Sequence, residues 1–200
     1  EHVGHLGDIG CFSFNGNKVI TCGGGGMLVT DNEAWAQKAK HLTTQAKVDP
    51  LEYIHNDIGY NYRLTNIQAA VGLAQLEMIK IFLEKKNKIY DYYKNAFKKI
   101  KGIYFNNKPK YAKNNKWMMS IQIDNKTINL KKDKSIALLS KQNIESRSIW
   151  LPVHQQRSYL SYQTYKIKNA TQIYKKTLNI PSSSNLSLKQ TDLVVKAIIK

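Results

Sequence analysis

Residues 7–30 read GDIGCFSFNGNKVITCGGGGMLVT, and the rest of the chain is interpreted around this stretch. Its apolar residues predict one strand over residues 9–14 and a second over residues 27–30. Between them lie an Asn-Gly-Asn turn, a single lysine, Lys18, and four consecutive glycines. A partly buried amine in a glycine-lined turn is a candidate nucleophile, because glycine lets another group approach the backbone closely. An ordinary surface lysine at the tip of a hairpin fits the same pattern.

Ser13 precedes Lys18 in the same stretch and adds a hydroxyl that can donate to an anion held at the turn. The order of residues disfavours a nucleotide P-loop, because there the lysine follows the glycines in the order G-x-x-x-x-G-K-[ST]. The chain also lacks the G-x-S-x-G elbow of serine hydrolases and any zinc-like spacing of cysteine, histidine and carboxylate residues. We therefore expect no metal site.

The chain has 200 residues, of which 42% are hydrophobic, enough for one domain or for a large and a small lobe. No apolar run approaches the ~20 residues of a membrane span, and no export signal is visible, so we expect no membrane partner. Two cysteines within residues 7–30 are no disulfide framework and favour a reducing cytoplasm. Because the chain lacks a starting methionine and leads almost directly into a strand, we expect its beginning to be missing.

The net charge is +17, and only three of the 31 basic residues are arginines. Such a charge is compatible with a basic module that binds anions or nucleic acid. It is equally compatible with lysines that coat solvated helix faces. The scatter of the lysines and the scarcity of arginine, which makes bidentate contacts to bases and phosphates, disfavour a nucleic-acid partner.

The first part of the chain is predicted to contain a helix over residues 32–42 and a long ordered loop over residues 43–63. The Thr-x-x-Gln form of residues 65–68 predicts a capping box. The helix behind it is apolar on both sides, which predicts deep packing or a subunit contact. Near Lys80 the pattern changes to a single apolar stripe with lysines elsewhere. We place a domain boundary there, between residues 1–80 and residues 81–200.

The second part is predicted to be a modest α+β unit. Period-2 alternation predicts a strand over residues 117–124 with Met119, Ile121 and Ile123 on one face. The other expected elements are a helix over residues 132–141, a short strand over 147–151, a weak helix over 171–178, and a helix over 185–200 that Ser187 caps and that buries Leu193, Val194, Ala197 and Ile198.

Four blocks in this order resemble the DegT-type sugar-nucleotide aminotransferases, and together they span essentially the whole chain. They are residues 7–30, GYNYRLTNIQAAVGLAQLE (59–77), ESRSIWLPVHQQRSY (145–159) and LNIPSSSNLSLKQTDLVVKAI (178–198). The resemblance implies an α/β fold. The chain would be the end portion of a pyridoxal-phosphate fold-type-I large domain followed by a small α+β C-terminal domain.

The resemblance also implies roles for single residues. Lys18 would be the Schiff-base lysine that holds pyridoxal 5'-phosphate and then moves a proton at the sugar C4 carbon. Ser13 would bind the cofactor phosphate, and Asn61 would reach the phosphate of the partner subunit in a homodimer. The substrate site would include Arg147, His154 and Arg63.

The full enzyme would aminate a 4-keto sugar nucleotide with glutamate as the amino donor. Gly24 stands where most relatives have glutamate, and the resulting glycine run resembles the branch acting on UDP-4-keto-6-deoxy-N-acetylhexosamines. In this family the N-terminal half supplies the carboxylate that pairs with the pyridine nitrogen. Without it the cofactor is a poor electron sink, so we expect the 200-residue chain alone to be inactive. The alternative is a non-catalytic remnant.

Overall fold

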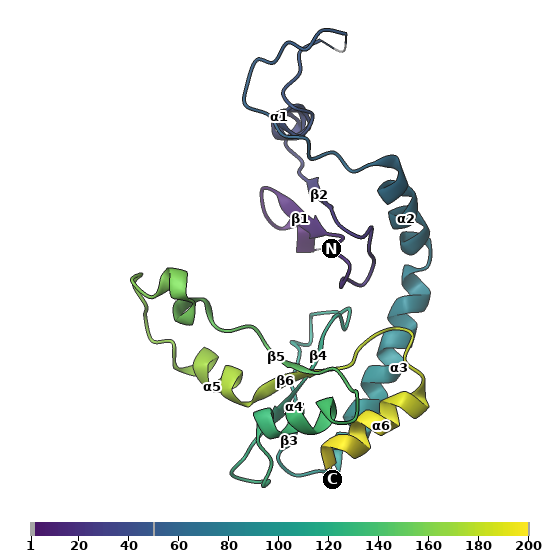
Figure 1. The fold of residues 1–200 in the computed structure, drawn as a ribbon, viewed down its shortest axis with the longest axis vertical. Helices are drawn as coiled ribbons and strands as arrows, with labels where there is room; N and C mark the ends of the chain where they lie inside the picture. Colours follow the sequence, from purple (N-terminus) through teal and green to yellow (C-terminus); the bar gives the residue numbers. More distant parts are fainter. Residues whose placement is uncertain (1–2, 50, 200) are drawn as a thin grey trace. The chain divides into compact units, whose positions relative to one another are not determined.

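The computed structural model describes residues 3–49 and 51–199 (Figure 1). The chain divides into two compact units, Glu1–Lys80 and Ile81–Lys200, and each is described by itself.

The first unit is built on a two-stranded antiparallel ladder. Its register pairs Gly10 with Val29 and Ser13 with Gly26, which confirms the two strands predicted around the glycine run. The Asn32 side chain accepts a hydrogen bond from the Trp35 backbone N–H at 3.2 Å and caps the helix that follows. The elements of this unit are a 3-10 turn (Val3–His5), β1 (Gly10–Ser13), β2 (Gly26–Val29), α1 (Glu33–Thr43) and α2 (Asn66–Glu77).

Helix α2 starts at the predicted capping box but is not packed deeply. Thr65 and Gln68 satisfy each other's backbone groups, as the sequence predicts. None of the residues of α2 is buried, however, so the expected deep packing is not found within the chain. Cys22 lies close to this helix, since its Sγ would be 2.5 Å from a Cβ placed on Gly72. The alternative expectation, a subunit contact, stays a prediction.

The second unit is a four-stranded antiparallel sheet with helices, in the strand order β3-β4-β6-β5. Two 3-10 turns, Val153–Gln155 and Arg157–Tyr159, lie between β5 and α5. The elements are α3 (Ile79–Lys98), β3 (Ile103–Phe105), β4 (Met119–Ile123), α4 (Lys132–Ser140), β5 (Arg147–Ser148), α5 (Lys168–Lys176), β6 (Thr177–Ile180) and α6 (Leu188–Ile199).

The core of this unit joins one face of the sheet to α3, α4 and α6. Strand β4 alternates as predicted, with Met119, Ile121 and Ile123 buried and the residues between them half-buried. These side chains pack in one cluster with residues of the three helices, which include Ile89, Tyr93, Phe97, Leu139, Val194 and Ile198. A contiguous cluster of this kind is what a single small domain needs for its stability.

Two predictions for this unit are wrong. Residues 177 and 178 were expected to close a helix, but residues 177–180 form the inner strand β6 between β4 and β5. All four are buried, so no alternation distinguishes this strand from the helix that ends directly before it. Leu193 was expected to point inward, but it is 53% exposed, whereas Val194, Ala197 and Ile198 are buried. The C-terminal end of the expected last helix, Lys200, lies outside the described residues.

Ser187 caps α6 as the sequence predicts. Its hydroxyl accepts a hydrogen bond from the Gln190 backbone N–H at 3.2 Å. The strand expected over residues 147–151 is shorter, since β5 covers Arg147–Ser148 only. Strand β3, which pairs Tyr104 with Gln122, was not expected.

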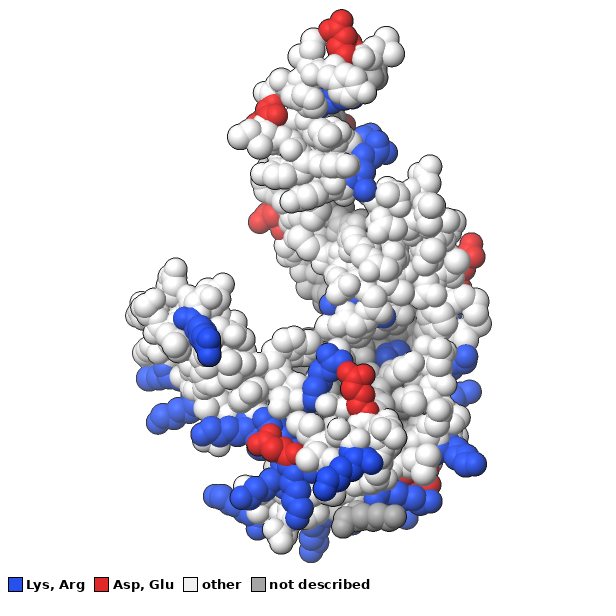
Figure 2. Space-filling model, viewed as in Figure 1, with Lys and Arg blue, Asp and Glu red and all other residues white. Residues whose placement is uncertain are grey.

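The positive charge of the chain belongs to the second unit. Residues 81–200 hold 25 of the 31 basic residues and only six of the 14 acidic ones. Figure 2 shows the Lys and Arg side chains gathered over this unit. The resulting field favours anionic ligands and attracts them over a distance of about one Debye length, ~8–10 Å at physiological salt.

We predict that Leu178→Ala lowers the free energy of unfolding of the second unit by about 2–5 kcal/mol, because it empties a site in β6 that is fully buried. Leu193→Ala is the matched control and should cost about 0.5 kcal/mol or less, since Leu193 is largely exposed. Urea unfolding followed by circular dichroism measures both. Equal losses in the two variants would contradict the assignment of residues 177–180 to the inner strand.

Candidate functional site

Lys18 and Ser13 line the same open hollow in the first unit. The hollow has a volume of about 440 Å³, and its other lining residues come from β1 and from Val3 and Gly4. The Lys18 side chain is half-buried. The structure therefore places a primary amine and a hydroxyl, both singled out from the sequence, around one space.

Backbone hydrogen bonds close the base of the loop that carries Lys18. The Phe14 N–H donates to Gly25 O at 3.0 Å, and the Cys22 N–H donates to Phe14 O at 3.0 Å. Within the loop, the Lys18 N–H donates to Asn15 O at 3.0 Å. The turn bearing the amine is thus a continuation of the β1–β2 ladder and not an unattached tip.

The four glycines are not equivalent. Gly23 and Gly25 have φ of +79° and +78°, where L side chains are rare. A Cβ on Gly26 would lie 2.3 Å from Phe12 O, which is too close for any side chain. A Cβ on Gly24 would meet only Gln68 Nε2 at 3.8 Å, an ordinary contact. Glycine is therefore required by the backbone at three of the positions, and Gly24 is the exception.

The hydroxyl of Ser13 is set up as a donor. Its oxygen accepts a hydrogen bond from the Asn15 backbone N–H at 3.4 Å, which leaves the hydroxyl hydrogen to point elsewhere. The Asn15 side chain in turn accepts from the Gly16 N–H at 2.8 Å. A hydroxyl donor beside an amine in one hollow matches the chemistry needed for a ligand that carries both a phosphate and an aldehyde.

Asn61 and Arg63 lie in the same unit but do not line this hollow. Asn61 is exposed and forms an isolated backbone bridge with Thr44. The neighbouring Tyr60 N–H donates to Leu42 O at 2.7 Å, so the end of α1 fixes the backbone around Asn61. The expected roles of Asn61 and Arg63 stay predictions.

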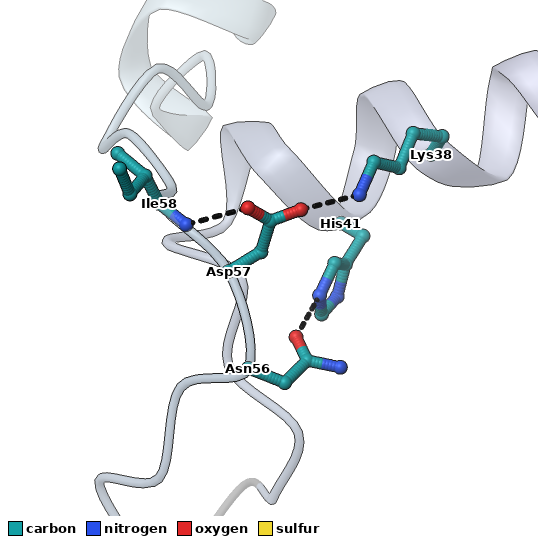
Figure 3. A network of polar contacts seen from close by, with 5 residues as sticks. All are labelled: Lys38, His41, Asn56, Asp57 and Ile58. Atoms are coloured by element: carbon teal, nitrogen blue, oxygen red, sulfur yellow. Dashed lines mark hydrogen bonds and ion pairs between the residues drawn. The ribbon is translucent and has the colours of Figure 1, made fainter.

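A polar network holds the segment before Asn61 against α1 (Figure 3). Lys38 Nζ lies 2.5 Å from Asp57 Oδ2, and the Ile58 N–H donates to Asp57 Oδ1 at 2.8 Å. Figure 3 also shows His41 Nε2 directed at Asn56 Oδ1, at 2.6 Å. The hydrogen bond from Lys38 is the largest cause that lowers the pKa of Asp57 below its ordinary value. Sequence reasoning missed this network, although Lys38 and His41 lie one turn apart on one helix face.

Arg147 and His154 lie in the second unit. Arg147 is on β5 opposite Asn179, and its guanidinium forms an ion pair with Glu145. His154 belongs to the first 3-10 turn after β5, with Nε2 3.4 Å from the Thr171 hydroxyl of α5. Their expected contact with a substrate stays a prediction.

Within residues 3–49 and 51–199, no three histidine, cysteine or acidic residues come together as a set of metal ligands. No helix in this part of the chain has the length and apolar character required to span a membrane.

Comparison with protein-family models matches residues 1–199 to the DegT/DnrJ/EryC1/StrS aminotransferase family. EpsN of Bacillus subtilis strain 168 is 37% identical over 205 residues, which cover 100% of this chain and 52% of EpsN. EpsN carries the provisional name of a pyridoxal phosphate-dependent aminotransferase. GDP-perosamine synthase of Escherichia coli O157:H7 is 36% identical, over 99% of this chain and 53% of the relative. The chain therefore spans about half the length of the curated relatives it matches.

Solved structures show the same fold. Helicobacter pylori PseC, an aminotransferase involved in the biosynthesis of pseudoaminic acid, matches with a TM-score of 0.89 at 25% identity. The match covers 100% of this chain and 54% of PseC. The structure therefore has the fold of the matching half of these fold-type-I aminotransferase structures.

We predict that Gly26→Ala lowers the free energy of unfolding of the first unit by about 1–3 kcal/mol. The steric conflict with Phe12 O outweighs the ~0.5–1 kcal/mol that alanine otherwise gains over glycine. Gly24→Ala is the matched control and should change stability by about 0.5 kcal/mol or less. Urea unfolding monitored by Trp35 fluorescence, in a chain with Trp117 and Trp150 replaced by phenylalanine, reports on this unit. Equal effects at the two positions would contradict the described packing.

We predict that the Asp57 carboxyl titrates below 3.8, its ordinary value, and that Lys38→Met raises this pKa. Because the folded-state pKa is depressed, the contribution of Asp57 to stability is present above pH 3.8. It is lost as the pH falls through the folded-state pKa. Carbon-detected NMR titration of the carboxyl measures the midpoint, with Lys40→Met as the control for a lost charge on α1. An unchanged midpoint in Lys38→Met would show that the pair does not form in solution.

Proposed function

Since the chain belongs to the DegT/DnrJ/EryC1/StrS aminotransferase family, we propose that it is the lysine-bearing part of a sugar-nucleotide aminotransferase. The complete protein would transfer an amino group from glutamate to a 4-keto sugar nucleotide. The relatives named as a GDP-perosamine synthase and as UDP-4-amino-4,6-dideoxy-N-acetyl-beta-L-altrosamine transaminases support a nucleotide-linked substrate. Among nucleotide-linked keto sugars, we propose a UDP-4-keto-6-deoxy-N-acetylhexosamine as the substrate.

The observation that supports this proposal is the common hollow of Lys18 and Ser13. The cofactor of the family is pyridoxal 5'-phosphate, which supplies an aldehyde and an electron sink when bound. Lys18 Nζ would bind the aldehyde carbon and would later move a proton at the sugar C4 carbon. The Ser13 hydroxyl would donate to the phosphate, since its oxygen already accepts from Asn15.

The substrate would be held by residues of the second unit. The guanidinium of Arg147 is a planar, positively charged fork that matches a carboxylate or a phosphate. Its present partner is the exposed carboxylate Glu145, and an anionic substrate would have to replace that contact. His154 would orient the substrate through the nitrogen that does not face Thr171. The surplus of basic residues in residues 81–200 favours an anionic substrate in the same way.

We further propose that the complete protein is a homodimer in which Asn61 contributes to the partner's cofactor site. The fixed backbone on both sides of Asn61 supports this role, because a rigid segment can present a side chain outward. The two cysteines, Cys11 and Cys22, are unpaired, which is compatible with a reducing cytoplasm. The chain alone would not be a competent transaminase.

We predict that Lys18 is the residue modified by pyridoxal 5'-phosphate. The chain would be co-expressed with the N-terminal half of the Escherichia coli GDP-perosamine synthase, loaded with the cofactor and reduced with borohydride. Peptide mass spectrometry should then find the pyridoxyl group on Lys18. Lys18→Ala should abolish both the label and the amination of a keto-sugar nucleotide.

Lys40→Ala is the matched control, because Lys40 is an exposed lysine of the same unit. It should retain the label and the activity. A label that persists in Lys18→Ala, or that spreads equally over other lysines, would refute the assignment of Lys18. A specific label on Lys18 without any amination would favour the non-catalytic remnant.

A further inference from the structure

The second unit presents a tryptophan on its surface that rests against another tryptophan. The ring centroids of Trp117 and Trp150 are 5.9 Å apart, with 36° between the ring planes. Trp150 is 64% exposed, whereas Trp117 is half-buried. Trp150 therefore offers an open aromatic surface that is supported from one side. An exposed indole face is a surface on which a flat aromatic ligand can stack.

The supporting tryptophan is held by its backbone on both sides. The Trp117 N–H donates to Asn115 Oδ1 at 3.0 Å. The Trp117 carbonyl accepts from the Ser182 hydroxyl at 3.0 Å and from Lys86 Nζ at 3.3 Å. These contacts fix the start of β4 and with it the ring on which Trp150 rests.

Lys86 is an unusual anchor, because its side chain is only 5% exposed. Its amine donates to the carbonyls of Trp117 and Ser182, at 3.3 Å and 2.5 Å. Among the described residues no ion pair satisfies its charge, and burial lowers the pKa of Lys86. Burying an amine without a counter-charge destabilises a fold. Burial of the Lys86 amine therefore lowers the stability of the fold. In return, its two hydrogen bonds hold Trp117 and the turn after β6 in place.

Trp150 also lies within the segment that the substrate would contact. It follows Arg147 by three residues and precedes His154 by four. The segment is tied to α5, because Gln155 Nε2 donates to the Thr171 hydroxyl at 3.2 Å. A flat ligand on Trp150 would thus have cationic and polar side chains within one short stretch of chain.

We propose that Trp150, supported by Trp117, is the stacking platform for the nucleobase of the sugar-nucleotide substrate, and that Lys86 is its positioning residue. This inference rests on the proposed function, since it takes the substrate to be linked to a nucleotide. A base has a flat π-face that stacks on an indole, whereas a sugar or a diphosphate has none. The positive charge of residues 81–200 favours the diphosphate that accompanies the base.

The test is a calorimetric titration of the full 200-residue chain with GDP and UDP, without pyridoxal 5'-phosphate. Trp150→Ala should weaken nucleotide binding by about tenfold or more, as expected for the loss of one base-stacking contact. Trp150→Phe should keep most of the affinity, because it keeps an aromatic face. Tyr165→Ala removes another exposed aromatic side chain of this unit and should leave the affinity unchanged.

Pyrophosphate and ribose 5-phosphate provide the ligands without a base. Both should bind much more weakly than GDP. If pyrophosphate binds as tightly as GDP, or if Trp150→Ala binds GDP like the parent chain, the platform is refuted. Trp150 fluorescence that changes with protein concentration but not with nucleotide would show that a second copy of the chain covers this residue. That result would also refute the platform.

Lys86→Met tests the positioning role. It should weaken GDP binding and change the near-UV circular dichroism of the tryptophans, because Trp117 loses one of its three backbone anchors. Lys132→Met is the matched control, since Lys132 is also buried but donates to Tyr174 O in α5. Equal effects of the two variants would show a general structural role and refute the positioning role. Because the titration contains no pyridoxal 5'-phosphate, a failure of the cofactor assignment remains distinguishable from a failure of the platform.

Discussion

The close approach of Gly26 to Phe12 is the constraint on which the candidate site depends. It allows β1 and β2 to pair up to Ser13, the last residue of β1. The hydrogen bonds of Phe14 with Gly25 and Cys22 then close the loop at the point where the ladder ends. The amine of Lys18 is consequently held beside the hydroxyl of Ser13 by backbone geometry. A side chain at position 26 would separate the strands and open the loop.

The two units are stabilised by different interactions. The first has few buried side chains and is held together mainly by hydrogen bonds of turns, caps and the Lys38–Asp57 pair. The second has a contiguous apolar core between a sheet and helices, and it carries most of the positive charge. Its polar interior is small but specific: Lys86 and Tyr93 of α3 both donate to carbonyls of the turn after β6. This helix thus fixes where β6 ends as well as the packing of the core.

Sequence reasoning succeeded where one periodic pattern or one local motif decides the structure. Strand β4 alternates, and the caps at Thr65 and Ser187 are local, so all of them were predictable. It failed at β6, because four consecutive buried residues have no period. For α2 the expected deep packing is not found within the chain, and the alternative of a subunit contact stays a prediction, since an apolar surface does not identify what covers it. The network of Lys38 and His41 could not be predicted, because its partners are 15 or more residues away in the chain.

The sequence by itself determined the family, the two strands around the glycine run and the alternating strand β4, because motif spacing and local periodicity are properties of neighbouring residues. Only the tertiary structure showed that three of the four glycines are required by the backbone and that Gly24 is not. The tertiary structure alone also revealed the exposed Trp150 on its anchored partner and the buried amine of Lys86. The physical reason is the same in each case. Steric room, burial and hydrogen-bond partners depend on residues that are distant in the chain and meet only after folding.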